Sequence, residues 1–146
     1  MKNTSQIFYL LILLASCKQE IAPPPDIIPL PLEMTMGRGH FSIDAQTRII
    51  YDDPDPALRL MGEELAEILA AAGTFSPEVV PQSIIRSYGN DIFLSADLND
   101  ESLGQEGYLL HINPKRMISI QANHAAGVMY GIHSLLQHFP AEFFSD

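Results

Sequence analysis

The chain has 146 residues, and its 18 acidic and 8 basic side chains give a formal net charge of −10 at neutral pH. This length is sufficient for one domain with a hydrophobic core. The acidic balance, without any cluster of lysines and arginines, argues against nucleic acid as a partner. The single cysteine excludes an intramolecular disulfide.

The first 17 residues have the pattern of a secretory leader. Lys2 is followed by the nine-residue apolar run Ile7–Ala15, which is too short to cross a bilayer and matches a signal-peptide core. The sequence Leu-Ala-Ser-Cys ending at Cys17 resembles the bacterial lipobox. That resemblance implies a lipid on Cys17 and a protein anchored to the membrane in the bacterial cell envelope, in the periplasm or at the outer membrane. A plain secretory leader with an incidental cysteine is the alternative.

A Pro-rich tether is expected at residues 18–26. The segment is polar and contains three consecutive prolines, a composition that favours an extended, semi-rigid spacer. The folded domain is predicted to begin at Ile27. Its first stretch, Ile27–Leu32, is apolar but carries Pro29 and Pro31, so we expect an edge strand or an extended entry segment.

The next part of the chain predicts a short hairpin and then a helix. Residues 41–43 and 48–51 are rich in apolar side chains and flank a polar turn, as in a hairpin. The Asp and Pro residues at 52–56 suit the first turn of a helix. Apolar residues then recur at helical spacing until Gly73 ends the helix. This apolar stripe consists of Leu58, Met61, Leu65, Ile68 and Ala72.

A second hairpin is predicted near the end of the chain, after a polar loop at 97–105. Apolar side chains alternate along Tyr108–Ile112 and Ile118–Ala122, which is the period of half-buried strands. Turn-forming residues at 113–115 connect the two strands. Further candidate strands lie at residues 79–80, 84–85 and 92–95.

A second helix is predicted from His124 to Phe139, with Asn123 as its N-cap and Pro140 as its stop. Its apolar stripe consists of Ala125, Val128, Met129, Ile132, Leu135, Leu136 and Phe139. The other face has no charge and two glycines, each of which costs roughly 1 kcal/mol relative to alanine. Because glycine allows another backbone to approach closely, we predict that this face is an interface with another domain. It consists of Gly127, Tyr130, Gly131, Ser134 and Gln137.

Three motifs together resemble one protein family. They are the pattern G-x-x-Y-G-x-x-S-L-x-Q from Gly127 to Gln137, the hairpin start Glu106-Gly107-Tyr108, and Ile28-Pro29-Leu30-Pro31. This set resembles the small α/β domain that precedes the catalytic barrel in glycoside hydrolase family 20, the β-N-acetylhexosaminidases. The resemblance covers roughly residues 27–140.

The expected fold class is α+β. Each of the two helices has one apolar stripe to bury, and a single sheet that carries both helices satisfies that requirement. The family resemblance implies the same architecture, in the form of a mixed, largely antiparallel sheet with two amphipathic helices on one face.

The resemblance also implies a function. Family 20 enzymes remove terminal N-acetylglucosamine or N-acetylgalactosamine from glycans, and the acetamido group of the substrate acts as the nucleophile. Their Asp-Glu pair, which orients that group and acts as general acid and base, lies in the barrel. We therefore expect an N-terminal fragment that is inactive alone and reaches glycan only through a missing barrel, with residues 141–146 as the start of the link.

No catalytic residue, cofactor or metal site is predicted within this chain. Asp100-Glu101 is the only Asp-Glu dipeptide, but it lacks the His and glycines of the family motif and lies in a polar loop. The five histidines do not have the spacing of a zinc site, and no phosphate-binding loop occurs.

Two other functions stay open. The chain could be an accessory domain from a different glycosidase family. It could also be a free-standing binding or structural module anchored at the envelope. The absence of tryptophan and the few aromatics outside predicted core positions argue against a glycan-binding module.

Overall fold

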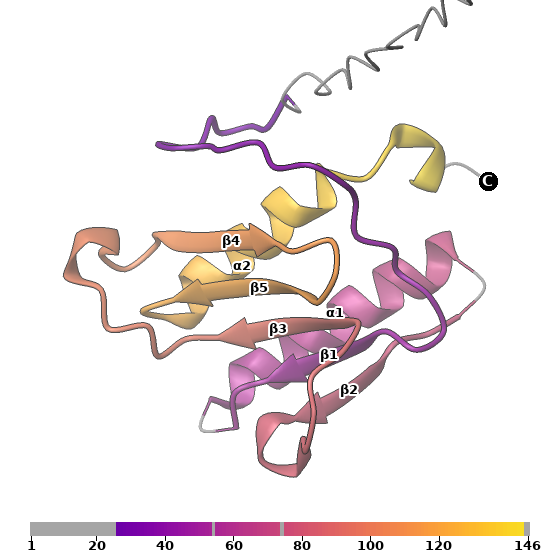
Figure 1. Cartoon of the computed structure of the whole chain (residues 1–146). Helices are drawn as coiled ribbons and strands as arrows, with labels where there is room; N and C mark the ends of the chain where they lie inside the picture. The colour runs from indigo at the N-terminus through magenta and orange to yellow at the C-terminus, as the bar shows by residue number, and fades with distance from the viewer. Residues whose placement is uncertain (1–25, 54, 74, 145–146) are drawn as a thin grey trace, which may run out of the picture.

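The computed structural model describes residues 26–144 with the exception of 54 and 74. Its described part contains a five-stranded sheet, two α-helices and three short 3-10 helices (Figure 1). The strands are β1 (Arg48–Tyr51), β2 (Glu78–Pro81), β3 (Asp91–Ser95), β4 (Tyr108–Ile112) and β5 (Met117–Ala122). The helices are α1 (Pro56–Ala72), α2 (Ala125–Leu136), η1 (Gln82–Ile84), η2 (Glu101–Leu103) and η3 (Ala141–Phe144).

The sheet is mixed, as predicted, but it is not largely antiparallel. The strand order is β2-β1-β3-β5-β4, and every neighbouring pair is parallel except β4–β5. The predicted hairpin of residues 41–43 and 48–51 is wrong, because 41–44 form no strand and β1 pairs with β2 and β3. The predicted second hairpin is confirmed, with Leu110 opposite Ile120.

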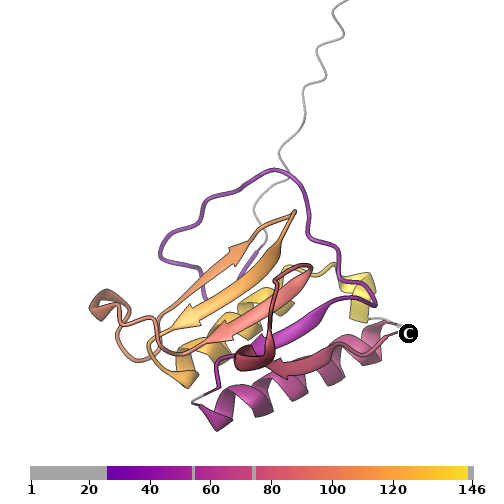
Figure 2. The same ribbon diagram turned by 60° about the horizontal axis from the view of Figure 1, so that its bottom comes forward.

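Both helices lie on one face of the sheet, as predicted (Figures 1 and 2). Asp55 caps α1 by accepting a hydrogen bond from the backbone N–H of Ala57, and the helix ends before Gly73. The N-cap of α2 is His124, without a side-chain cap bond. The predicted cap, Asn123, instead holds the preceding loop, because its amide bonds to the backbone of Asp100 and Gly104.

The hydrophobic core lies between the sheet and the two helices. Alternate residues of each central strand point toward the helices. In β3 these are Ile92 and Leu94, and in β5 they include Ile118 and Ile120. The helices contribute Leu58, Leu65, Leu69, Val128, Ile132 and Leu135, all of which are buried.

The connection from β2 to β3 lies on the opposite side of the sheet from the helices and is fixed by polar contacts. Arg48 forms a two-point ion pair with the buried carboxylate of Asp91, at 2.8 and 3.0 Å, and also donates to the carbonyl of Ser87. Asp53 accepts hydrogen bonds from the backbone and hydroxyl of Ser83.

Candidate domain interface

The two glycines of α2 face the protein's own sheet. A Cβ on Gly127 would collide with the carbonyl oxygen of Gly107 and would lie 2.7 Å from the Cβ of Ala122. A Cβ on Gly131 would collide with Ile120 and would lie 3.2 Å from the ring of Tyr108. The inference of a close backbone approach is therefore correct for Gly127, but the neighbouring backbone is that of Gly107 in the same domain. At Gly131 the close neighbours are the side chains of Ile120 and Tyr108.

Ser134 is buried on the same side of α2. Its hydroxyl and that of Tyr108 are 2.5 Å apart, which joins the helix to β4. The prediction of an exposed interface is therefore wrong for Gly127, Gly131 and Ser134. The physical reason is that the buried arc of α2 is wider than its apolar stripe. The small residues Gly127, Gly131 and Ser134 lie against the strands, and the larger apolar residues beside them fill the core.

The remaining predicted residues, Tyr130 and Gln137, are exposed. They share the outer face of α2 with Met129, Ala126 and His133, which are also exposed. Met129 and Tyr130 leave 38% and 39% of their surface open to solvent. This face carries no Asp, Glu, Lys or Arg. The helix therefore has an uncharged exposed face, as the prediction required, but only Tyr130 and Gln137 of the predicted residues belong to it.

A shallow groove runs between α1 and α2 beside this face. Its walls are apolar, with Glu64 and His133 as the polar members of the lining. The apolar residues are Met61, Leu65, Ile68, Met129, Ile132 and Leu136. A groove lined by methionines and other apolar side chains, next to an uncharged face of α2, is the type of surface on which another domain packs, although α1 also exposes the charged residues Arg59, Glu64 and Glu67.

Gln137 makes a contact that the sequence pattern did not reveal. Its Oε1 accepts a hydrogen bond from the backbone N–H of Ile28 (2.8 Å), and its Nε2 donates to the carbonyl of Ile28 (3.0 Å) and to that of His133 (3.3 Å). The end of α2 therefore holds the segment by which the chain enters the domain. Nothing in the local pattern of either segment signals this contact between residues 109 positions apart.

Asp100 has a structural role in the described fold. Its carboxylate accepts hydrogen bonds from the backbone N–H (3.0 Å) and hydroxyl (2.6 Å) of Ser102 and so caps η2. The hydroxyl bond and then the backbone bond lower the pKa of Asp100 from its ordinary value. A carboxyl group with a lowered pKa is a poor proton donor at neutral pH, and its neighbour Glu101 is exposed at the start of η2.

The remaining sequence predictions concern the lipid on Cys17, the tether, metal binding and the membrane. Cys17 and the tether up to residue 25 lie outside the described residues. Among the residues that are described, no group of three or more His, Asp and Glu side chains is arranged to hold a metal ion. Over the same residues, no helix is both long and apolar enough to cross a membrane.

Residues 24–143 match the family model described as glycosyl hydrolase family 20, domain 2. The chain belongs to glycoside hydrolase family 20. A relative of this family 20 domain is a protein of Porphyromonas gingivalis named Beta-hexosaminidase, which is 33% identical over 117 residues. That match covers 80% of this chain and 14% of the relative.

Solved structures of family 20 enzymes share the fold. The β-N-acetylhexosaminidase of Streptomyces coelicolor A3(2) is similar with a TM-score of 0.71 and 29% identity, over 85% of this chain and 23% of that one. The N-acetyl-β-hexosaminidase of Streptomyces plicatus is similar with a TM-score of 0.60 and 28% identity, over 73% of this chain and 20% of that one. This family 20 domain thus spans less than a quarter of the enzymes it resembles.

Proposed function

We propose that this chain is the non-catalytic accessory domain of a β-N-acetylhexosaminidase, which supports a barrel that removes terminal N-acetylglucosamine or N-acetylgalactosamine from glycans. The observation that carries the proposal is the match of residues 24–143 to domain 2 of family 20. In support, Asp100 has the role of a helix cap, which leaves the only Asp-Glu dipeptide without the features of a general acid.

The barrel is proposed to pack on the outer surface of the helix layer. The sheet-facing sides of both helices are already buried in the domain's own core. The outer face of α2 is uncharged and borders the apolar groove between the helices, and α1 exposes the charged residues Arg59, Glu64 and Glu67. Burying Met129 and Tyr130 there would contribute about 1–2 kcal/mol each, since burial of a large apolar side chain is worth roughly 1.5–3 kcal/mol and these two are already partly buried.

The experiment that tests this function uses aryl N-acetyl-β-glucosaminides as substrates. The purified chain is expected to release no aryl product, because the acid–base pair of family 20 is expected in the barrel and not in this domain. Residues 27–144 inserted in place of the matching 117 residues of the P. gingivalis Beta-hexosaminidase are expected to yield an active chimera.

Two results would contradict the proposal. One is turnover by the chain alone that disappears in an Asp100→Asn, Glu101→Gln variant. The other is a chimera no more active and no more stable than the relative from which the matching residues have simply been deleted.

We also propose that the protein is a lipoprotein of the bacterial envelope, with its lipid on Cys17. The support is the apolar run Ile7–Ala15 followed by the lipobox-like residues that end in Cys17. The polar, Pro-rich segment 18–26 would then separate the family 20 domain from the membrane surface.

A further inference from the structure

The entry segment, residues 27–36, exposes an unusual run of large apolar side chains. Ile28, Leu30 and Leu32 leave 79%, 84% and 100% of their surface open to solvent. Met34 and Met36 follow and are also exposed. Scattered single apolar residues are normal on a surface, but a contiguous series of them marks an interaction site.

The base of the entry segment is fixed to the domain. Ile27 is buried against it, and the side-chain amide of Gln137 pairs with both the N–H and the carbonyl of Ile28. A third hydrogen bond, from Nε2 to the carbonyl of His133, fixes the orientation of the amide. The start of the entry segment at Ile28 is therefore held in a defined position, which limits the conformations of the residues that follow and lowers the entropy lost when a partner binds.

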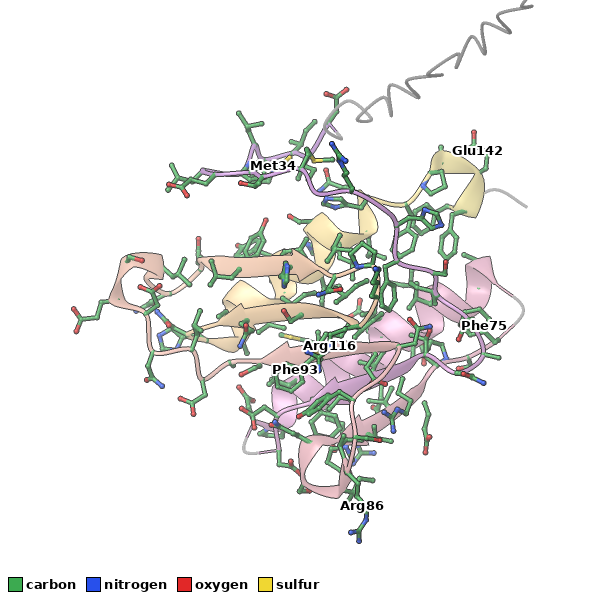
Figure 3. All side chains as sticks on the ribbon, viewed as in Figure 1. Met34, Phe75, Arg86, Phe93, Arg116 and Glu142 are labelled. Atoms are coloured by element: carbon green, nitrogen blue, oxygen red, sulfur yellow. The ribbon has the colours of Figure 1, made fainter. Side chains whose placement is uncertain are left out.

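The entry segment continues the outer face of α2. Gln137 lies at the end of that face, one helical turn beyond His133 and two beyond Tyr130. Figure 1 shows the entry segment beside the C-terminal end of α2, close to the point where the chain continues into η3. Figure 3 shows Met34 in the entry segment and Glu142 in η3 on the same upper side of the molecule. The entry segment thus begins at the C-terminal end of the outer face of α2, where Gln137 holds Ile28.

We propose that the entry segment is a second docking surface for the catalytic barrel, and that Gln137 is the positioning residue that joins it to the helix surface. This inference rests on the proposed function. The relatives are four or more times longer than their match to this chain, so a large remainder of the enzyme is there to cover an apolar surface next to α2. A second copy of this chain is a poorer partner, because two copies would each bring a net charge of −10.

The test compares backbone amide exchange in the isolated chain with that in the chimera described above. Amides of residues 32–36 and of α2 are expected to exchange about tenfold or more slowly in the chimera. Slower exchange in α2 alone would overturn this inference and leave the proposed function standing. Unchanged exchange in both segments would contradict both. If the isolated chain exchanges these amides as slowly as the chimera and sediments as a dimer, the surface binds a second copy of the chain. That result would also overturn the inference.

Variants of the chimera test the two parts of the proposal separately. Leu30→Ser with Leu32→Ser is expected to abolish the protection of residues 32–36, whereas Leu109→Ser, an exposed apolar residue on β4, is expected to preserve it. Gln137→Ala is expected to reduce the same protection, and the exposed loop residue Gln105→Ala is the matched control. Unchanged exchange of β3 amides shows that each variant is folded. Full protection in the folded Gln137→Ala chimera would refute the positioning role.

Discussion

At the scale of single residues, the glycines of α2 determine how closely the helix approaches the sheet. Gly131→Ala would place a methyl group against Ile120 and Tyr108. We expect a loss of about 1–3 kcal/mol in the free energy of unfolding, because overpacking outweighs the roughly 1 kcal/mol gain in helix propensity. Urea unfolding of the purified chain measures this loss. Gly89→Ala is the control, since a Cβ there meets nothing within 4 Å, and an equal change in both variants would contradict the packing seen at Gly131.

Asp100 provides a second prediction at this scale. Its carboxyl group should titrate below its ordinary pKa, because the hydrogen bonds from Ser102 favour the ionised form. Ser102→Ala removes the largest of these contributions, so we expect the pKa of Asp100 to move back toward its ordinary value, as measured by NMR titration of the carboxyl carbon.

The sign of the linkage follows from the lowered pKa. The stabilisation of η2 by Asp100 should be complete above the ordinary pKa of 3.8 and should disappear as the pH falls through the lower, folded-state value. A titration curve that does not change in Ser102→Ala would show that the side-chain hydrogen bond does not control this group.

At the scale of elements, the stripes of both helices can be tested by truncation. Leu65 is fully buried in α1 and Ile132 is nearly so in α2, whereas Leu60 leaves 67% of its surface exposed. Leu65→Ala and Ile132→Ala are each expected to lower the free energy of unfolding by about 2–5 kcal/mol. Leu60→Ala should cost less than about 1 kcal/mol. Similar midpoints in urea for Leu60→Ala and Leu65→Ala would mean that α1 is rotated about its axis.

The sequence was sufficient to locate most elements but not to determine how the strands pair. Helical and alternating periodicities predict α1, α2, β4 and β5 because those patterns are local. The directions of β1 and β2 are determined by the helix between them, since a strand–helix–strand connection produces parallel neighbours. That order is present in the sequence, and the hairpin-like residues 41–51 obscured it.

The candidate site was predictable only in part for a related reason. The uncharged character of one side of α2 is visible in the sequence, and Tyr130 lies on it. Which residues of that side contact the sheet depends on the depth at which α2 sits, and this depth is determined by Gly107, Ala122 and Ile120. The pairing of Gln137 with Ile28 depends on the complete fold, so no local pattern encodes it.

At the scale of the whole molecule, the proposed lipid on Cys17 would determine the position of the family 20 domain relative to a membrane. Processing at this residue is expected to attach several acyl chains, and more than one chain is needed for stable anchoring. The processed protein should partition into detergent and should carry its lipids on an N-terminal Cys17 in mass spectra. Cys17→Ser should move the protein to the soluble fraction, and full retention of this variant with the membranes would contradict the lipid anchor.

The bond between Gln137 and Ile28 also sets an order of events during synthesis. The two residues are separated by 109 positions, so nearly the whole domain must be translated before its first residues acquire their final partner. Until Gln137 at the end of α2 has been made, the entry segment lacks the hydrogen bonds that hold Ile28 in place. The contact between the two ends of the domain can therefore form only late in synthesis, after most of the domain has been made.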